Sequence, residues 1–298
     1  MIDSISVIER LTLVAPFGVR FRDEVSGSIV GDGLTVTAYP PINPARRVQA
    51  FANPSGVYVL RNVPGLRNFE HGAGDANFWN NLPPKRSFII EVVDNARRFQ
   101  SFRFTADLPV RGLFPWECGA TASSPPTTPA MVPLYSAPTR PVPAGMAVLR
   151  AQLWDPIAQV YAAGAVIEVQ LLGRPPVRGF ADALGRIVLI FPYPEPTDFV
   201  LDSLPSASPV GASVPLTQHT WSIELRAAYA PQQPVPFIPD LCTTLMQSPA
   251  ILWADKARTQ HLPPVTLHFG QELVVRSTDT AHNTALPVLL ITPAVSPP

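Results

Sequence analysis

Short stretches in which apolar and polar residues alternate recur along the whole chain. Phe17, Val19 and Phe21, for example, alternate with glycine and arginine, which is the two-residue period of a half-buried β-strand. Only residues 1–16 and 240–254 have spacing compatible with a helix, and residues 1–16 could equally form an edge strand. The pattern therefore predicts an all-β protein with few short helices. Further segments with the character of strands are residues 34–38, 87–93, 99–104, 146–155, 164–172, 187–191, 219–229, 265–276 and 286–298.

A cassette of strand and turn occurs twice, in residues 48–65 and in residues 178–194. Both copies contain Phe-Ala, then Asn or Asp, two further residues, Gly, an apolar strand and Pro. An Asn or Asp side chain can accept hydrogen bonds from the backbone ahead of it, and Gly supplies a positive φ. Because a fixed turn sets the strand register, these residues have a structural explanation that requires no ligand. The turn residues are Asn53, Gly56, Asp182 and Gly185.

The order of the predicted elements also repeats, which indicates a duplicated unit. We therefore predict two tandem β-sandwich domains. In the second, we expect residues 187–191 to form a central and largely buried strand, with the preceding turn at one end of the sandwich. The predicted boundaries are 1–107 for the first sandwich, 108–145 for a connecting strap, 146–275 for the second sandwich and 276–298 for an apolar C-terminal tail. We expect this tail to return to a sheet edge or to dock on a partner, since an unpaired apolar strand promotes aggregation.

Proline sets the character of the connecting strap. The chain has 37 prolines in 298 residues, well above the usual ~5%, and proline is excluded from helix interiors and central strands. Because the strap is dense in Pro, Ser, Thr and Ala, we expect it to run extended and partly as polyproline II. It also carries Phe114, Trp116 and Tyr135. These large apolar groups predict a strap packed on a surface rather than a free linker.

The charge of the chain excludes two classes of partner. There are 22 basic and 22 acidic residues, so the formal net charge is zero. Nucleic acids and anionic membranes both require a basic surface, so neither is a predicted partner. Charged residues make up 15% of the chain, against about 25% in typical domains. Such a surface suits a protein that buries area against other subunits or copies of itself, and it equally suits a Pro-rich secreted domain.

The N-terminal residues do not have the composition of a signal peptide. Asp3 and Glu9 stand where a basic region belongs, and the apolar run that follows is short. No stretch approaches the ~18 apolar residues of a membrane-spanning helix, so we predict no membrane insertion. We expect residence in the cytoplasm, at least at synthesis.

No catalytic or cofactor-binding motif is present, and the sequence predicts neither an enzyme nor a bound cofactor. Cys118 and Cys242 lie far apart and outside any CxxC motif, so we predict isolated thiols, although a single bridge would also satisfy the count. The candidate metal ligands are His261, His268 and Cys242. A metal site needs three or four convergent ligands, and nothing in their spacing dictates convergence, so no metal site is predicted.

Four large aromatic residues outside the predicted strands are candidates for contact with a partner: Trp79, Phe114, Trp116 and Tyr135. Tryptophan could also provide a platform on which a sugar stacks. Trp79 and Trp116, in predicted loops, are better placed for this than Trp154 and Trp221, which lie in predicted strands.

FANPSGVYVLRNVPG, in residues 51–65, resembles the carboxypeptidase regulatory-like repeat, a transthyretin-type β-sandwich. The residues that match its pattern of Asn or Asp, Gly, aromatic strand and Pro-Gly are Asn53, Gly56, Tyr58, Pro64 and Gly65. The second copy matches at Asp182, Gly185, Phe191 and Pro192 but has Tyr193-Pro194 in place of the final Gly. The resemblance implies two tandem transthyretin- or immunoglobulin-like sandwiches. It implies little about function, because such modules serve as spacers and interaction domains.

A second resemblance covers more of the chain. Residues 108–115, 133–155 and 179–194, in this order, look like segments of proteins encoded beside phage-tail-like extracellular contractile injection systems. This resemblance implies a non-enzymatic structural or adaptor subunit at the baseplate or spike end of such a particle, with the other subunits as its partners. It also implies that any release of the chain occurs within that extracellular particle. The alternative is a secreted or surface β-sandwich module that binds carbohydrate or protein.

Overall fold

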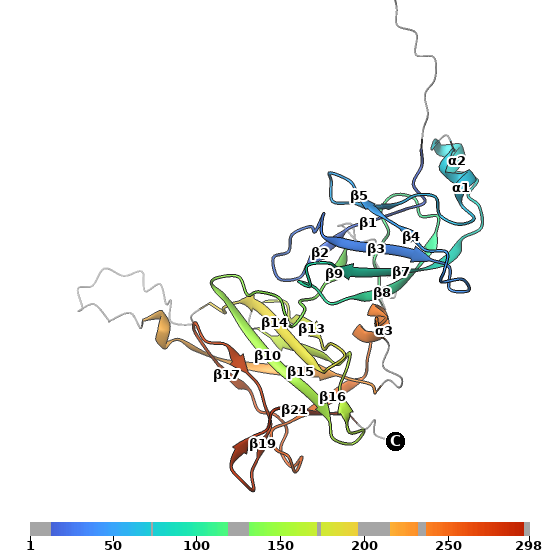
Figure 1. The fold of residues 1–298 in the computed structure, drawn as a ribbon. Helices are drawn as coiled ribbons and strands as arrows, with labels where there is room; N and C mark the ends of the chain where they lie inside the picture. Colours follow the sequence, from blue (N-terminus) through green and yellow to red (C-terminus); the bar gives the residue numbers. More distant parts are fainter. Residues whose placement is uncertain are drawn as a thin grey trace, which may run out of the picture. The chain divides into compact units, whose positions relative to one another are not determined.

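The chain folds mainly into β-strands, as the sequence predicts (Figure 1). The computed structural model describes residues 13–72, 74–118, 131–171, 174–195, 215–231 and 237–294. The helices in these ranges are short, and none is long enough to cross a membrane. They are α1 (Arg67–Glu70), α2 (Ala76–Asn80), α3 (Leu241–Leu245) and the 3₁₀ helix η1 (Leu216–Gln218). The prediction for residues 1–16 falls largely outside the described ranges.

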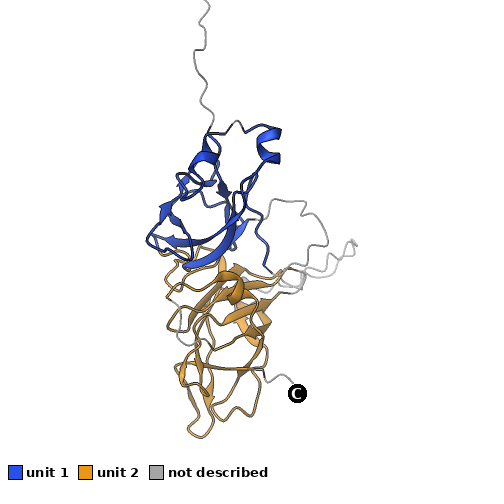
Figure 2. Ribbon diagram, turned by 90° about the vertical axis from the view of Figure 1, so that its right-hand side faces the viewer, with its two compact units in different colours: residues 1–96, 101–134 blue, residues 97–100, 135–298 orange. Residues whose placement is uncertain are grey.

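Two compact units divide the chain (Figure 2). Unit 1 comprises residues 1–96 and 101–134, and unit 2 comprises residues 97–100 and 135–298. These boundaries differ from the predicted ones, because the predicted strap is divided between the units after Leu134 and the predicted tail lies within unit 2. Strand pairing explains both differences. β9 (Val132–Leu134) pairs with β2 (Phe21–Asp23) in unit 1, and β21 (Leu289–Pro293) pairs with β16 (Pro249–Trp253) in unit 2.

Unit 1 contains two antiparallel sheets besides the parallel pair β2 and β9. Along β7 the side chains of Phe88, Ile90 and Val92 are buried, whereas the residues between them are partly exposed. This is the alternation that the sequence predicts for a strand with one face on a core. The smaller sheet has the order β1 (Phe17–Val19), β6 (Tyr58–Leu60), β5 (Phe51–Ala52). The larger has the order β4 (Val48–Gln49), β3 (Leu34–Tyr39), β7 (Arg86–Asp94), β8 (Phe102–Leu108).

Unit 2 is built around one long strand, β10 (Met146–Asp155). β10 pairs with β14 (Arg186–Pro192), β11 (Val160–Tyr161), β18 (Leu273–Val274) and β21. From β21 the pairing continues through β16, β15 (Thr220–Ala228) and β12 (Val166–Gln170) to β13 (Val177–Phe180). The two remaining pairings are β17 (Val265–His268) with β15, and β19 (Thr278–Asp279) with β20 (Thr284–Ala285). One apolar core, which includes Leu149, Ile167, Leu189 and Leu252, fills the space between these strands.

The predicted apolar strand of the second cassette is β14. Each residue from Ile187 to Phe191 is at most 1% exposed, so the predicted burial is confirmed. Its predicted central place in the sheet is wrong, because among the described residues β14 pairs with β10 alone. The strand is buried by the core on which it packs rather than by a neighbour on each edge.

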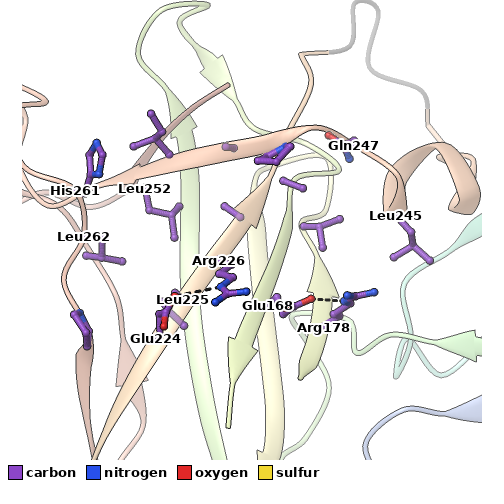
Figure 3. A pocket seen from close by; sticks show the side chains of 17 residues that line it. Glu168, Arg178, Glu224, Leu225, Arg226, Leu245, Gln247, Leu252, His261 and Leu262 are labelled. Carbon is purple, nitrogen blue, oxygen red and sulfur yellow. Dashed lines mark hydrogen bonds and ion pairs between the residues drawn. The ribbon is translucent and has the colours of Figure 1, made fainter. Parts of the chain in front are cut away.

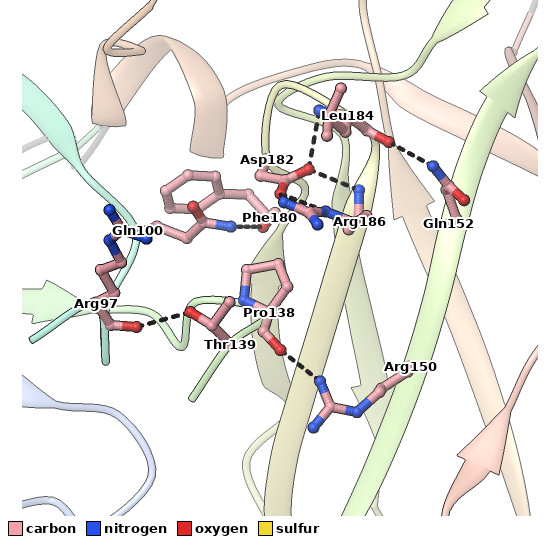
Figure 4. Close-up of polar contacts among 10 residues, drawn as sticks. All are labelled: Arg97, Gln100, Pro138, Thr139, Arg150, Gln152, Phe180, Asp182, Leu184 and Arg186. Carbon is pink, nitrogen blue, oxygen red and sulfur yellow. Dashed lines mark hydrogen bonds and ion pairs between the residues drawn. The ribbon is translucent and has the colours of Figure 1, made fainter. Parts of the chain in front are cut away.

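The cassette turn in the second copy has the predicted chemistry (Figure 4). The backbone N–H groups of Leu184 and Arg186 each donate to Asp182 Oδ1 over 2.9 Å. Arg186 also pairs through its guanidinium with Asp182 Oδ2 at 2.7 Å, and Gly185 has a φ of 69°. The side-chain amide of Gln152, on β10, donates to the carbonyl oxygen of Leu184 over 3.1 Å and ties the turn to the neighbouring strand.

The first copy has the same turn in a different setting. The N–H groups of Ser55 and Val57 both donate to Asn53 Oδ1 over 3.0 Å, and Gly56 has a φ of 70°. Here the flanking strands β5 and β6 pair with each other as a hairpin. In the second copy the flanking strands β13 and β14 pair instead with β12 and β10. The turn is therefore a local unit that the fold uses in two ways.

The second segment with helical spacing, residues 240–254, is helical only in its first half. Asp240 caps α3, because its carboxylate accepts a hydrogen bond from Thr243 N over 2.9 Å. Pro249 then opens β16, and proline is tolerated at the first residue of a strand but not inside a helix. The helix therefore ends before this proline.

Candidate functional site

A groove of about 650 Å³ opens on unit 2 (Figure 3). Its lining comes from β12, β13, β15 and β16, from α3 and the residues that follow it, and from the segment 261–264. All of these residues belong to unit 2. The volume falls within the ~300–1,000 Å³ that is usual for ligand pockets.

The groove exists because β15 changes its partner along its length. Residues Thr220–Ile223 of β15 pair with β17, and Ala227 and Ala228 pair with β16. Between them, Glu224, Leu225 and Arg226 pair with β12 but with neither β16 nor β17. The strands β16 and β17 therefore diverge along β15, and the groove opens in the fork between them.

Leucine side chains supply much of the apolar lining of the groove. Leu225 comes from β15, Leu252 from β16 and Leu262 from the segment that leads to β17, and Leu252 is only 6% exposed. Leu225 and Leu262 pack against the core of unit 2. Leu245 lines the groove from α3 (Figure 3). A ligand in the groove would therefore remove apolar surface from water, which is the main favourable term in association.

Paired charges border this apolar surface. The register places Glu168 on β12 opposite Arg178 on β13 and opposite Arg226 on β15. Glu168 forms an ion pair with Arg178, and Arg226 Nε lies 3.2 Å from Glu224 Oε1 (Figure 3). Opposite charges on neighbouring strands stabilise a sheet modestly. Since the two arginines are matched by two glutamates, these four side chains carry no net charge.

The sequence does not predict that these charged residues are neighbours. The signal present in it is Glu168 in the predicted strand 164–172, Glu224 and Arg226 in the predicted strand 219–229, and Arg178 at the start of the second cassette. That signal says nothing about which strands lie side by side. The groove is therefore a product of strand order.

Three of the four aromatic residues predicted to face a partner pack within unit 1. The ring of Trp79 lies 5.6 Å from that of Phe69. The ring of Phe114 lies 5.4 Å from that of Phe104, and Trp116 lies 5.3 Å from the same ring. All three side chains are half-buried. Phe114 and Trp116 thus hold their part of the predicted strap on the sheet of unit 1, and none of the three lines the groove.

Tyr135, the fourth predicted partner residue, belongs to unit 2 and is only 6% exposed. Its ring packs edge-on against Phe180 at a centroid distance of 5.7 Å. The carbonyl oxygen of Tyr135 accepts a hydrogen bond from Gln100 N over 2.9 Å, and the side chain of Gln100 donates to the carbonyl oxygen of Phe180 (Figure 4). The prediction that Tyr135 faces a partner is wrong, because its apolar ring is used inside the unit.

The candidate metal ligands do not converge. His261 lies beside Trp253 at the groove, and His268 is an exposed residue of β17. In the part of the chain that the structure describes, no group of three or more His, Cys, Asp or Glu side chains could hold a metal ion.

Neither cysteine is a free thiol, since Cys118 and Cys242 are both disulfide-bonded. The prediction of isolated thiols is therefore wrong. The sequence does not show this, because only the tertiary structure decides which cysteines can form a disulfide. Cys242 consequently has no thiolate to offer a metal.

A small polar cluster surrounds Asp279 in the hairpin of β19 and β20. Asp279 Oδ2 lies 2.9 Å from Lys256 Nζ and 3.1 Å from His282 Nδ1. The hydrogen bond from Lys256, with that from His282, lowers the pKa of Asp279 from 3.8 to about 2. Asp255 immediately precedes Lys256 in the sequence. Burial raises the pKa of Asp255, but hydrogen bonds from Gln260 and Thr259 outweigh this effect and lower it.

We expect Asp279→Asn to lower the melting temperature at neutral pH and to have progressively less effect in acid. The pKa of Asp279 is lower in the folded state, so its carboxylate stabilises the fold above pH 3.8, and this contribution is lost as the pH falls towards about 2. Thermal melts between pH 7 and pH 2 measure the difference between the variant and the parent. Asp107→Asn, at an exposed position of β8, makes the same change in charge and serves as the control. A difference that stays constant down to pH 2 would contradict this account.

No protein-family model matches the sequence, and no curated protein matches it. Among solved structures, the Bacillus anthracis TIE protein is 11% identical, with 60% of this chain and 27% of that chain covered and a TM-score of 0.22. The shaft pilin SpaA from Lactobacillus rhamnosus GG is 7% identical, with 95% and 100% covered and a TM-score of 0.21. BcpA, the major pilin subunit of Bacillus cereus, is 9% identical, with 89% and 55% covered and a TM-score of 0.19. Likenesses with TM-scores this low establish neither a family nor a function for the chain.

Proposed function

We propose that the chain is a non-enzymatic interaction module that works as a structural or adaptor subunit of a larger protein assembly. The observation that carries this proposal is the groove in the fork of β15, which offers about 650 Å³ lined by leucines and bordered by paired charges. Its occupant is an extended, largely apolar segment of a neighbouring subunit.

The backbone of β15 supports an extended occupant. From Glu224 to Arg226, β15 pairs with β12 on one edge, and no described strand pairs with these residues on the other edge. Unpaired strand edges recruit extended segments, with main-chain hydrogen bonds for affinity and side-chain pockets for specificity. The groove places leucines next to this edge, so an added segment would gain both kinds of contact.

The balance of charge supports an uncharged occupant. Glu168 is already paired with Arg178, and Glu224 with Arg226. A charged segment would find no unmatched partner among these four side chains, and burial of an unpaired charge is costly. An apolar segment fits the leucines without disturbing either pair.

Within this class, we propose that the assembly is a contractile phage-tail-like injection particle and that the chain belongs to its baseplate or spike end. This finer assignment rests on the sequence resemblance of residues 108–115, 133–155 and 179–194. The repeated cassette is compatible with it, because β-sandwich modules of the carboxypeptidase regulatory-like type act as spacers and interaction domains.

Mass spectrometry of intact assemblies tests the proposal. High-mass particles purified from the source cells should contain the chain in a constant ratio to the other subunits through successive purification steps. Co-purification with sheath and tube proteins would identify a contractile particle. A chain that occurs solely in low-mass fractions would exclude a permanent structural role.

Two adjacent residues, the last residue of α3 and the C-cap that follows it, test the role of the groove. Leu245 lines the groove, whereas Met246 is 61% exposed and does not line it. We expect Leu245→Glu to reduce the amount of chain in assembled particles at least about tenfold, because it places an unpaired carboxylate at the interface. Met246→Glu makes a similar change outside the groove and should leave incorporation unaltered. Equal incorporation of both folded variants would show that the groove is not the docking surface.

A second candidate function is a secreted or surface module that binds carbohydrate. An aromatic row in unit 2 favours it: the ring of Tyr193 lies 5.4 Å from Trp221 and 4.7 Å from Phe269, and His219 stacks on Trp221 at 6.1 Å. All four side chains are half-buried. The disulfide-bonded cysteines also fit an oxidising compartment. Retention of the purified chain on immobilised oligosaccharides, without any protein partner, would favour this candidate.

A further inference from the structure

A second pocket, of about 550 Å³, lies in unit 1 at the end of the first cassette. Three arginines line it: Arg46 and Arg47, which precede β4, and Arg67 in α1. Asn62 and Gly65, from the loop after β6, complete this side of the pocket. The chain as a whole is neutral, so three arginines in one pocket are a local concentration of positive charge.

The loop after β6 is held in place by a buried carboxylate. Glu70 is 6% exposed, and it accepts hydrogen bonds from the backbone N–H groups of Asn62 and Val63 over 2.9 and 3.0 Å. Asn62 adopts a positive φ of 57°. The negative charge of Glu70 is thus used to shape the loop, and Glu70 is not among the residues that line the pocket.

Two further contacts position guanidinium groups at the pocket. Arg47 lies 2.9 Å from Glu91 Oε1, and its guanidinium stacks over the ring of Tyr39 at 4.5 Å. Arg86 packs directly on Gly65, since a Cβ atom built on Gly65 would lie 2.1 Å from a guanidinium nitrogen of Arg86. Glycine at this position therefore lets a fourth arginine approach the wall of the pocket.

The charge of the pocket is not balanced by its own lining. None of the described residues that line it is acidic, and Glu91 matches Arg47 alone. Arginine presents a planar fork of N–H donors that suits the paired oxygens of carboxylate, phosphate and sulfate. The lining thus combines the donors and the positive potential that an oxyanion requires.

We propose that this pocket binds an oxyanion group: a phosphate, a sulfate or the carboxylate of an acidic peptide. The site is independent of the groove in unit 2 and goes beyond the proposed assembly role. It belongs to the first cassette copy alone, because Gly65 has no counterpart in the second copy, where Tyr193-Pro194 follows Pro192.

Nuclear magnetic resonance of the full chain tests this site. Sodium sulfate, sodium phosphate and a short oligo-glutamate peptide are titrated separately at low ionic strength. We expect at least one of them to shift the backbone amide signals of Gly65 and Asn62 in a saturable manner. A response to sulfate or phosphate assigns a small oxyanion, and a response to the peptide alone assigns a carboxylate of a protein partner.

A pair of double variants separates the pocket from general charge effects. Arg46→Gln with Arg67→Gln should raise the apparent dissociation constant of the anion at least about tenfold, because two charge-assisted donors are lost. Arg174→Gln with Arg276→Gln removes the same charge from exposed positions of unit 2 that line neither pocket, and should leave binding unchanged. Since Arg46 and Arg67 are exposed, both variants should retain the parent melting temperature. The absence of any saturable shift, or equal weakening in both variants, would overturn the proposal.

Discussion

Phe191→Ala is expected to destabilise unit 2 by about 3–5 kcal/mol, the usual range for removing a buried phenylalanine ring. Phe191 is 0% exposed and belongs to the apolar core of the unit. It stands opposite Ala147 on β10, and an alanine cannot move to fill the space that the ring leaves. The loss of stability therefore combines the transfer free energy of the removed ring with the cost of the cavity that remains.

Chemical denaturation, followed by hydrogen exchange in peptides from β14, measures the free energy of unfolding of unit 2 separately from that of unit 1. Val274→Ala, at a residue of β18 that is 45% exposed, is the control and should change stability by about 0.5 kcal/mol or less. A cost below about 1 kcal/mol for Phe191→Ala would mean that β14 is not a core strand.

Gly185→Ala is expected to destabilise unit 2 by about 2–4 kcal/mol, from the left-handed backbone conformation together with a steric clash. Gly185 has a φ of 69°, and a Cβ atom there would lie 2.3 Å from the carbonyl oxygen of Leu153. The backbone cannot move away freely, because Leu153 N donates to the carbonyl oxygen of Gly185 over 2.7 Å. The added methyl group therefore clashes with the backbone of Leu153, which is hydrogen-bonded to the same turn.

Two other glycines separate the clash from the backbone conformation. Gly164 has a φ of 72° and no atom within 4 Å of a Cβ position, so Gly164→Ala should cost only the ~1 kcal/mol of the left-handed conformation. At Gly56 the Cβ would lie 2.8 Å from a side-chain methyl of Ile29, which is 45% exposed and can turn away. Melting temperatures should therefore fall most for Gly185→Ala. A loss of stability for Gly185→Ala no greater than that for Gly164→Ala would contradict the predicted clash.

The cassette turns could be predicted from the sequence because all of their chemistry is local. Asp182 and the N–H groups that it binds lie within five consecutive residues, as do Asn53 and its donors. Burial of β14 was predictable for a similar reason, since five consecutive apolar residues have few alternatives to a core. These features follow from residue type and short spacing alone.

The candidate site could not be predicted in the same way. Glu168, Arg178 and Arg226 form one row only because β13, β12 and β15 are neighbours in that order. The arginine pocket likewise unites Arg46 and Arg67 from opposite ends of a cassette. Such proximity depends on contacts between residues far apart in the chain, which periodicity does not encode.

Tyr135 shows how far residue type alone can mislead. A tyrosine in a Pro-rich segment is a reasonable candidate for a partner contact, and its burial against Phe180 depends on where β13 lies.

By itself, the sequence determined the β-strand character, the two turns and the burial of residues 187–191. Tertiary structure alone decided the strand order, the fork in β15, the two pockets and the oxidation of the cysteines. The physical reason is that turn and strand chemistry acts over a few residues, whereas packing joins groups whose separation along the chain is unrelated to their distance in space.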